Sequence, residues 1–232
     1  MDIKDKVIII TGASEGIGKA LAQALARQGA KLVLAARSDA KIKQLTDSLP
    51  DSIGVHADMR QAADITAMVD AALKRHGRID ILVNNAGQGM YCSVEQVDLE
   101  QYQSIMDLNV YAPLRAMQAV IPHMRRAGSG MIVNISSMVS KNAYPTLGAY
   151  ASTKYALNAL SLTARAELAR DKIVVSLMHP KMTATRFGAN VVGADPAVDS
   201  QPLAPAPGVD TAEQVADKII QLIHSEAAEA NM

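Results

Sequence analysis

Tyr150 and Lys154 are the residues whose types and spacing most directly suggest chemistry. They lie four positions apart in a stretch that we expect to be helical, which puts both side chains on one helix face, one turn apart. An isolated tyrosine has a pKa of about 10, and a neighbouring ammonium group favours the phenolate and lowers that pKa. Such a tyrosine can donate a proton to a carbonyl oxygen as hydride reaches the carbon. Taken alone, this pair is more often a solvated helix face, so the interpretation depends on further residues.

Ser137 adds a third candidate, at the end of an expected strand over residues 131–136. Its hydroxyl could hydrogen-bond the same substrate oxygen while negative charge develops on it. We therefore expect acid–base chemistry carried by side chains, and we assign no metal site.

A glycine-rich segment, Thr11 to Gly18, falls between the first expected strand and its helix. Glycines let the backbone turn sharply and approach a ligand closely, and the helix N-terminus behind them suits a pyrophosphate. The spacing is GxxxGxG rather than the GxGxxG dinucleotide fingerprint, so glycines that only shape a tight turn are an alternative. The candidate cofactor-binding residues of this segment are Gly12, Ser14, Glu15, Gly16, Ile17 and Gly18.

Arg37 follows the second expected strand and indicates which dinucleotide is bound. An acidic side chain at position 36 would repel a ribose 2′-phosphate, whereas Ala36 leaves room and Arg37 can pair with that phosphate. The pattern predicts NADPH/NADP+ rather than NADH, with a plain surface charge as the alternative for Arg37. Asp58, after the third strand, could accept a hydrogen bond from the adenine amino group or could cap its own loop.

The tetrapeptide Asn84 to Gly87 closes the fourth expected strand. Ligands of open α/β sheets bind at the carboxyl ends of the strands, so Asn85, Ala86 and Gly87 are further cofactor-binding candidates. A turn built from asparagine and glycine is the alternative.

Short apolar runs alternate with longer segments of helical period, which predicts an α/β fold: a single doubly wound, Rossmann-like parallel β-sheet with helices on both faces. We expect one dinucleotide-binding catalytic domain over residues 1–232. It includes a substrate loop or lid at about 182–210 and a C-terminal helix at about 211–225; an irregular surface loop is the alternative to the lid. The expected strands are 7–10, 32–36, 53–57, 79–84, 131–136 and 173–178, and the other expected helices are 16–28, 40–49, 62–75, 100–127 and 149–169, with kinks at Pro113 and Pro122.

Composition limits the possible functions. The 232 residues carry 23 basic and 23 acidic side chains, 3% aromatic residues and no tryptophan, which argues against a nucleic-acid partner. The single cysteine, Cys92, cannot form an internal disulfide, and the apolar run near the N-terminus is too short to span a membrane. We expect a cytoplasmic protein with a small-molecule partner.

These motifs together resemble the short-subunit branch of the short-chain dehydrogenase/reductase family. TGASEGIG, NNAG and YxxxK are similar to family motifs, and Ser137 precedes Tyr150 by the usual thirteen residues. The resemblance implies that Tyr150 is the acid–base, that Ser137 orients the substrate oxygen, and that Lys154 lowers the Tyr150 pKa and holds the nicotinamide ribose. It further implies that Asn109 supports Lys154 through a proton-relay water.

The resemblance also covers the segment after the sixth strand. Pro180 and Thr185 match the family pattern, and Thr185 would hydrogen-bond the nicotinamide carboxamide. Lys181 replaces a family glycine; it either points harmlessly outward or contacts the substrate or cofactor. Many relatives continue into a seventh strand, and we find no such strand after Ile223.

The expected substrate is a small-to-medium apolar ketone or aldehyde, or the corresponding alcohol, in a methionine-rich wall. An acyl-carrier-bound 3-oxoacyl thioester is the alternative within the same chemistry, and a non-catalytic NADPH-binding sensor or scaffold is the alternative of another class. A homodimer through the helices 100–127 and 149–169 is expected, with a homotetramer as the other possibility. The candidate substrate residues are Gln88, Met138, Tyr144 and Phe187, and Met90 is also expected near the substrate.

Overall fold

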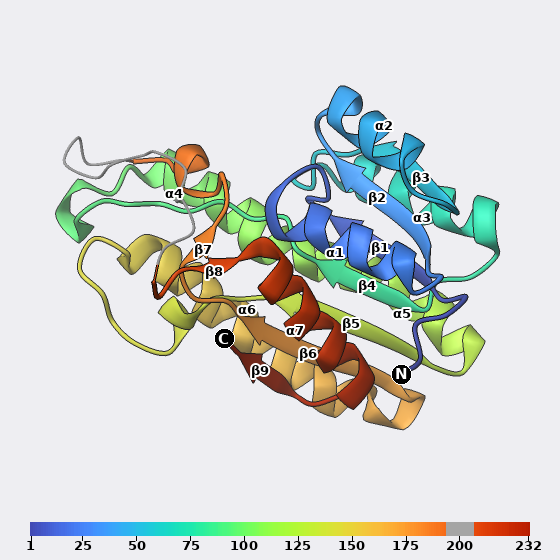
Figure 1. Cartoon of the computed structure of the whole chain (residues 1–232). Helices are drawn as coiled ribbons and strands as arrows, with labels where there is room; N and C mark the ends of the chain where they lie inside the picture. The colour runs from blue at the N-terminus through green and yellow to red at the C-terminus, as the bar shows by residue number, and fades with distance from the viewer. Residues whose placement is uncertain (194–206) are drawn as a thin grey trace.

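The computed structural model describes residues 1–193 and 207–232, and Figure 1 shows how their helices and strands are arranged. A seven-stranded sheet has the order β3-β2-β1-β4-β5-β6-β9, and all its pairings are parallel. Parallel strands covered on both faces read as continuous apolar runs, and β1 is buried at every position. The strands are β1 Val7–Thr11, β2 Lys31–Ala36, β3 Ser52–His56, β4 Ile81–Asn84, β5 Gly130–Ile135, β6 Ile173–His179 and β9 Glu229–Asn231.

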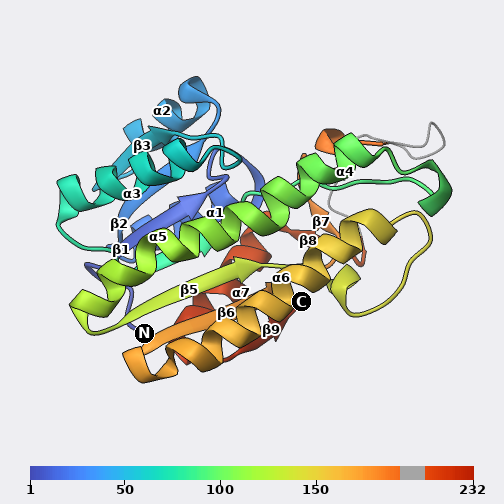
Figure 2. The same cartoon turned by 180° about the vertical axis from the view of Figure 1, so that it is seen from behind.

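Helices cover both faces of this sheet. Alternate residues of β1 point to opposite faces, so Ile8 and Ile10 pack with α1 and α7, whereas Ile9 packs with α3 and α5. Figures 1 and 2 show these two layers from opposite sides. This is the predicted doubly wound α/β fold. The helices are α1 Gly16–Arg27, α2 Asp39–Asp47, α3 Ala62–His76, α4 Leu99–Met106, α5 Ala112–Ala127, α6 Gly148–Leu168 and α7 Ala212–Ser225.

A seventh strand does follow Ile223, so the expectation of none was wrong. Strand β9 pairs with β6 through the registers Leu177↔Glu229 and His179↔Asn231. It is a three-residue edge strand, and its sequence, Glu-Ala-Asn, carries no apolar run. An edge strand needs mainly backbone hydrogen bonds from its neighbour, and these leave no hydrophobic pattern to read.

The expected long helix over 100–127 is interrupted, but not where kinks were placed. A π-helical turn, Asp107–Tyr111, separates α4 from α5, and the Ala112 N–H donates to the carbonyl of Asp107, five residues back. Pro113 stands in the first turn of α5, where its missing N–H costs little, and Pro122 lies inside α5. Asn109 is in the π-helical turn, and π-turns within helices are frequent at functional sites.

The segment between β6 and α7 contains two short strands, β7 Thr183–Ala184 and β8 Asp210–Thr211, which pair in parallel. Thr211 begins α7 through a capping box: its hydroxyl accepts from the Gln214 N–H, and its own N–H donates to the Gln214 side chain. The predicted lid falls partly on residues 194–206, which lie outside the described residues. None of the described helices is long and apolar enough to cross a bilayer.

Candidate active site

A cavity of about 670 Å³ lies along the carboxyl ends of the strands, where ligands of open α/β sheets bind. It spans the switch point of the sheet, where β1 has β2 on one side and β4 on the other. The cavity therefore joins segments that are far apart in the sequence. Those of the predicted site residues that line it are Gly12, Ser14, Glu15, Gly16, Ile17, Arg37, Asp58, Asn85, Ala86, Gly87, Gln88, Ser137, Met138, Tyr144, Tyr150, Lys154, Pro180, Thr185 and Phe187.

Two predicted site residues, Gly18 and Asn109, do not line the cavity. A Cβ on Gly18 would lie 2.5 Å from the carbonyl oxygen of Gly12. Gly18 therefore permits the close packing of the glycine loop on α1 rather than facing a ligand. Asn109 is fully buried behind the cavity wall.

The glycine loop is tied to the NNAG segment. Gly12 has φ +65°, and a Cβ there would lie 2.9 Å from the Cα of Ala86. The Asn85 amide donates to the carbonyls of Thr11, at 2.9 Å, and Gly12, at 3.1 Å. The Thr11 hydroxyl in turn accepts the backbone N–H groups of Asn85 and Ala86. These hydrogen bonds join the glycine loop and the NNAG segment into one continuous floor of the cavity.

The floor leads to the N-terminus of α1, which suits an anion. Glu15 is the N-cap residue but makes no side-chain cap, and the first turn of α1 holds no acidic residue. The backbone N–H groups of the first turn of α1, and the positive end of the helix dipole, thus remain available to a phosphate. The Glu15 carboxylate is turned to Lys41, 2.8 Å away, and that hydrogen bond is the main cause of its lowered pKa. The cradle fits the pyrophosphate of a dinucleotide.

Basic side chains also line the cavity. Exposed Arg37 lines the cavity beside Ala36, and Lys41 and Arg60, which the sequence interpretation missed, line it as well. Asp39 is in the first turn of α2 and contacts His56 at 2.9 Å. The position of Lys41 in that first turn, next to Arg37, was the sequence signal that could have found it.

Asp58 caps its loop, and its predicted contact with the adenine amino group stays a prediction. It lines the cavity, and its Oδ1 accepts the backbone N–H of Arg60 at 3.0 Å, which caps the loop after β3. One carboxylate can accept several hydrogen bonds, so the capping contact leaves acceptor capacity on the cavity side.

Ser137, Tyr150 and Lys154 meet at the centre of the cavity wall. Ser137 follows β5, and Tyr150 and Lys154 are nearly buried on α6. The Lys154 ammonium donates to the carbonyl of Ile135 at 2.9 Å and lies 5.8 Å from the Tyr150 ring centroid. The helical spacing of four therefore brings the two side chains together, as predicted.

Burial governs the protonation of this group. It raises the pKa of Tyr150, against the lowering effect of a hydrogen bond with Ser137, and it lowers the pKa of Lys154 to about 8. We expected Lys154 to lower the Tyr150 pKa; within the protein alone the shift is upward, because desolvation of the phenolate outweighs the favourable contacts. Tyr150 is thus a neutral phenol at neutral pH, which is the form that donates a proton.

Asn109 acts on the wall from behind. Its Oδ1 accepts the Gln88 N–H at 2.9 Å, and its Nδ2 donates to the Gln88 carbonyl at 2.8 Å and the Thr153 hydroxyl at 3.1 Å. The π-helical turn thus connects the strand β4 loop with α6. The proton-relay role implied by the resemblance remains a prediction.

The end of the cavity where we expect the substrate is lined mostly by apolar side chains. Met138, Tyr144 and Phe187 line it together with Tyr91, Leu147 and Met182, which the sequence interpretation missed. The Phe187 ring packs on Tyr150 with 5.8 Å between centroids. These additional residues come from loops, where no periodic pattern marks them.

Two polar residues complete this end, and one candidate lies elsewhere. Gln88 accepts from Arg60 at 2.9 Å and donates to the Asn190 carbonyl at 2.8 Å. Lys181 lines the cavity with its ammonium 3.5 Å from Asp210. Met90 is fully buried and does not line the cavity.

A doubly wound parallel sheet, a glycine loop at its switch point and a buried tyrosine–lysine pair in one cavity define the class of dinucleotide-binding oxidoreductases. The chain belongs to the short-chain dehydrogenase family, whose model matches residues 6–195. It is an oxidoreductase of the NAD(P)-binding kind.

Similar proteins agree with this assignment. An uncharacterized oxidoreductase of Methylorubrum extorquens is 40% identical over 196 residues, which are 82% of this chain and 78% of the relative. A 3alpha-hydroxysteroid dehydrogenase of Mediterraneibacter gnavus is 36% identical over 80% of this chain and 76% of its own. The solved structure of an alcohol dehydrogenase from Thermococcus sibiricus complexed with 5-hydroxy-NADP has a TM-score of 0.88 at 28% identity, covering 99% of this chain and 96% of that chain.

Proposed function

We propose that the protein is an NADPH-dependent carbonyl reductase that reduces a small-to-medium apolar ketone or aldehyde, and that catalyses the reverse alcohol oxidation. The observation that carries the proposal is the meeting of Ser137, Tyr150 and Lys154 on the wall of one cavity that continues to the phosphate cradle. The apolar lining supports an apolar substrate, as does the similarity to a hydroxysteroid dehydrogenase.

In this proposal each side chain of the wall has a separate task. NADPH supplies the hydride when bound. Tyr150 donates its phenolic proton to the carbonyl oxygen, and the Ser137 hydroxyl hydrogen-bonds the same oxygen as charge develops on it. Lys154, with a pKa of about 8, holds the nicotinamide ribose and returns a proton toward Tyr150. Asn109 supports this arrangement by holding Gln88 and Thr153.

The phosphate cradle and the basic side chains of the cavity support NADPH as the cofactor. Ala36 offers no carboxylate against a 2′-phosphate, and Arg37 lines the cavity beside it, with Lys41 in the first turn of the next helix. Thr185 and Pro180 line the cavity near the catalytic wall, in keeping with a contact to the nicotinamide carboxamide.

The remaining proposals concern the setting of the enzyme. We place it in the cytoplasm as one catalytic domain with a lid over about 182–210, acting on a small molecule. It forms a homodimer through the helical segment from α4 to α5 and through α6. Exposed apolar side chains on the segment from the π-helical turn to α6, namely Tyr111, Tyr155 and Leu162, support that dimer face.

The decisive experiment measures the loss of nicotinamide absorbance with NADPH, and separately with NADH, across ketones, aldehydes and a 3-oxoacyl thioester. Turnover with NADPH on simple apolar carbonyls is the expected result, and preferred turnover of the thioester would select the acyl-carrier substrate instead. Tight NADPH binding without turnover of any compound would select the sensor and overturn the reductase proposal.

The Tyr150→Phe variant tests the division of labour. It removes the proton donor but leaves the ring, so we expect kcat to fall by about 10²-fold or more while the NADPH Kd stays within about twofold. The matched control is Tyr155→Phe, since Tyr155 is half exposed on the same helix. Loss of NADPH binding in Tyr150→Phe would contradict the assignment.

A further inference from the structure

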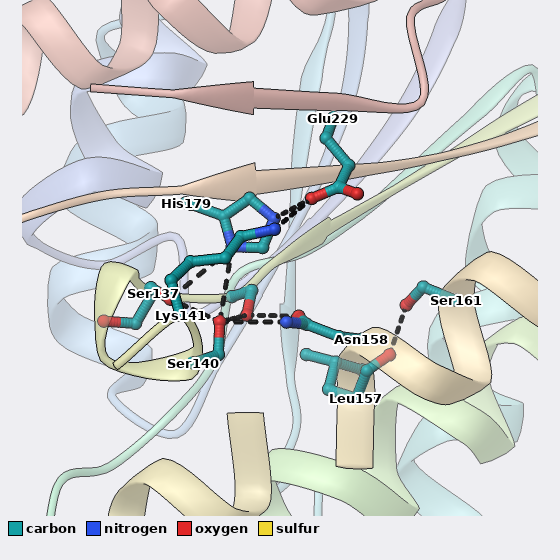
Figure 3. Close-up of polar contacts among 9 residues, drawn as sticks. Ser137, Ser140, Lys141, Leu157, Asn158, Ser161, His179 and Glu229 are labelled. Atoms are coloured by element: carbon teal, nitrogen blue, oxygen red, sulfur yellow. Dashed lines mark hydrogen bonds and ion pairs between the residues drawn. The ribbon is translucent and has the colours of Figure 1, made fainter. Parts of the chain in front are cut away.

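A second polar cluster lies directly behind Ser137, outside the cavity. It is formed by Ser140, Asn158, His179 and Glu229, with Lys141 at its edge, and Figure 3 shows these residues converging from four segments of the chain. None of the four lines the cavity. Ser140 and His179 are buried, and buried polar groups need hydrogen-bond partners, whereas Asn158 and Glu229 are partly exposed.

Glu229 is the residue that brings β9 into this cluster. Its Oε2 accepts from the Lys141 ammonium at 2.5 Å and contacts His179 Nε2 at 2.8 Å. Lys141 follows the short 3-10 turn Met138–Ser140 that begins at Ser137, and His179 ends β6 just before Pro180. One carboxylate oxygen thus holds together the segments on both sides of the catalytic wall.

His179 lies between Glu229 and the segment Ser137–Ser140. Its side chain is fully buried, and its Nδ1 lies 3.4 Å from the Ser140 hydroxyl and 3.5 Å from the Ser137 carbonyl oxygen. The lowered pKa of Glu229, caused chiefly by Lys141, keeps it ionised. A carboxylate only accepts, so the imidazole donates its Nε2–H to Glu229. Burial lowers the pKa of His179, so the ring is neutral and its Nδ1 is an acceptor. The ring therefore reaches Ser137 through the Ser140 hydroxyl, which lies next to Nδ1 and also donates to the Ser137 carbonyl.

Ser140 and Asn158 make further hydrogen bonds around the Ser137 backbone. The Ser140 hydroxyl donates to the Ser137 carbonyl at 2.6 Å and accepts from the Asn158 amide at 2.9 Å. Asn158 is one helical turn beyond Lys154, so Tyr150, Lys154 and Asn158 form one stripe of α6 that contacts the segment after β5. The backbone of Ser137 therefore depends on this cluster, while its hydroxyl faces Tyr150.

We propose that Glu229, acting through His179, is a positioning residue that fixes the place of Ser137 relative to Tyr150. The inference rests on the proposed function for the role of Ser137, but its structural part does not. Strand β9, which has no residue in the cavity, thereby contributes to the reaction geometry. Small displacements of a group that stabilises the developing charge lower the rate without preventing cofactor binding.

The first test is amide hydrogen exchange of the full-length protein. Glu229→Met removes both contacts at similar side-chain length, and we expect exchange of the backbone amides of 138–141 to accelerate about tenfold, with α1 unchanged. Glu229→Gln keeps an acceptor oxygen and should restore most of the protection. The control Glu226→Met removes the ion pair of Glu226 with the terminal amine of Met1, a contact far from Ser137, and should leave 138–141 unchanged.

The second test is a double-mutant cycle on kcat with the best substrate of the panel. Glu229→Met should lower kcat about tenfold with KM and the NADPH Kd nearly constant, and it should cost nothing further in a Ser137→Ala background. Glu229→Gln should recover most of kcat. An undiminished loss in the Ser137→Ala background, or unchanged exchange at 138–141, overturns the proposal. Absence of wild-type turnover would instead refute the reductase function, and the exchange result would still decide the positioning role.

Discussion

At the scale of single residues, the site is defined by two ionisable side chains, Tyr150 and Lys154, whose burial shifts each pKa so as to favour the neutral form. Burial on α6 raises the pKa of Tyr150 and lowers the pKa of Lys154 to about 8. Desolvation disfavours the charged form of both residues. It moves the two pKa values in opposite directions because tyrosine is charged when deprotonated and lysine is charged when protonated. A proton donor and an exchangeable ammonium thus lie side by side near neutral pH.

Lys154 consequently lowers the stability of the fold. Its folded pKa is depressed relative to the unfolded value of 10.5, so between about pH 8 and 10.5 the unfolded state binds more protons and stability rises with pH; below about pH 8 the full cost of burying the ammonium is present. We expect Lys154→Met to raise the free energy of unfolding at pH 7 by about 1–3 kcal/mol.

Denaturant unfolding of Lys154→Met and wild type at pH 7 and pH 10 measures this effect. The gain should shrink at pH 10, where the wild-type lysine is already neutral in the folded state. An equal difference at both pH values would show that the charge of Lys154 is not responsible.

We propose that Arg37 sets the cofactor preference by charge. Arg37→Asp places a carboxylate beside the 2′-phosphate position, so the ratio of kcat/KM for NADPH over NADH should fall at least about tenfold. Initial rates with both cofactors measure it, and Arg170→Asp is the control because Arg170 is exposed and does not line the cavity. An unchanged ratio in Arg37→Asp would make Arg37 a surface charge only.

At the scale of elements, the β1–α1 loop and the β4 loop behave as one unit. Thr11 and Asn85 exchange hydrogen bonds between the two, and the glycine backbone leaves room for that approach. The π-helical turn plays the same part for the β4 loop and α6 through Asn109. Irregular backbone is thus concentrated where elements must approach closely.

Gly12→Ala tests this unit. The added Cβ would lie 2.9 Å from the Ala86 Cα in a left-handed backbone, so we expect a loss of about 1–3 kcal/mol in stability and at least about tenfold weaker NADPH binding. Gly77→Ala separates strain from the clash: Gly77 has φ +74°, and its Cβ would meet no atom within 4 Å. Thermal unfolding and a binding titration should show a smaller stability loss in Gly77→Ala and unaltered NADPH affinity.

At the scale of the whole molecule, the two helical layers differ in what they leave exposed. The layer with α6 carries the half-exposed apolar residues Tyr155 and Leu162, and α7 lies on the other face of the sheet. Apolar side chains clustered on helices that already pack on a sheet suit contact with a second copy of the same face.

Leu162→Glu should therefore convert the expected dimer into a monomer, because two carboxylates would be buried at an isologous interface. Multi-angle light scattering measures the mass. Gln221→Glu introduces the same charge at an exposed position of α7, away from α6, and should leave the dimer intact. A mass that is equal in both variants would place the interface elsewhere.

Much of this molecule was predictable from the sequence because its signals are local. Buried strands, helix starts, the glycine loop, and the spacing of Tyr150 and Lys154 each depend on residues within a few turns of one another. The doubly wound fold and the identity of most cavity-lining residues follow from those signals and from the family motifs. Gly18 and Asn109 were the exceptions, because Gly18 packs against the glycine loop and Asn109 is buried behind the cavity wall.

Only the tertiary structure decided the remainder. Strand β9 has no apolar pattern and exists because the edge of β6 offers it backbone partners. The direction of the Tyr150 pKa shift depends on burial, which neighbours from distant segments impose. Glu229 and His179 are 50 residues apart, and the helix between them contributes nothing to the sequence signal of either residue. Local physics determined the elements and the spacing of the tyrosine–lysine pair, whereas long-range packing determined the protonation of the pair and the residues that hold it in place.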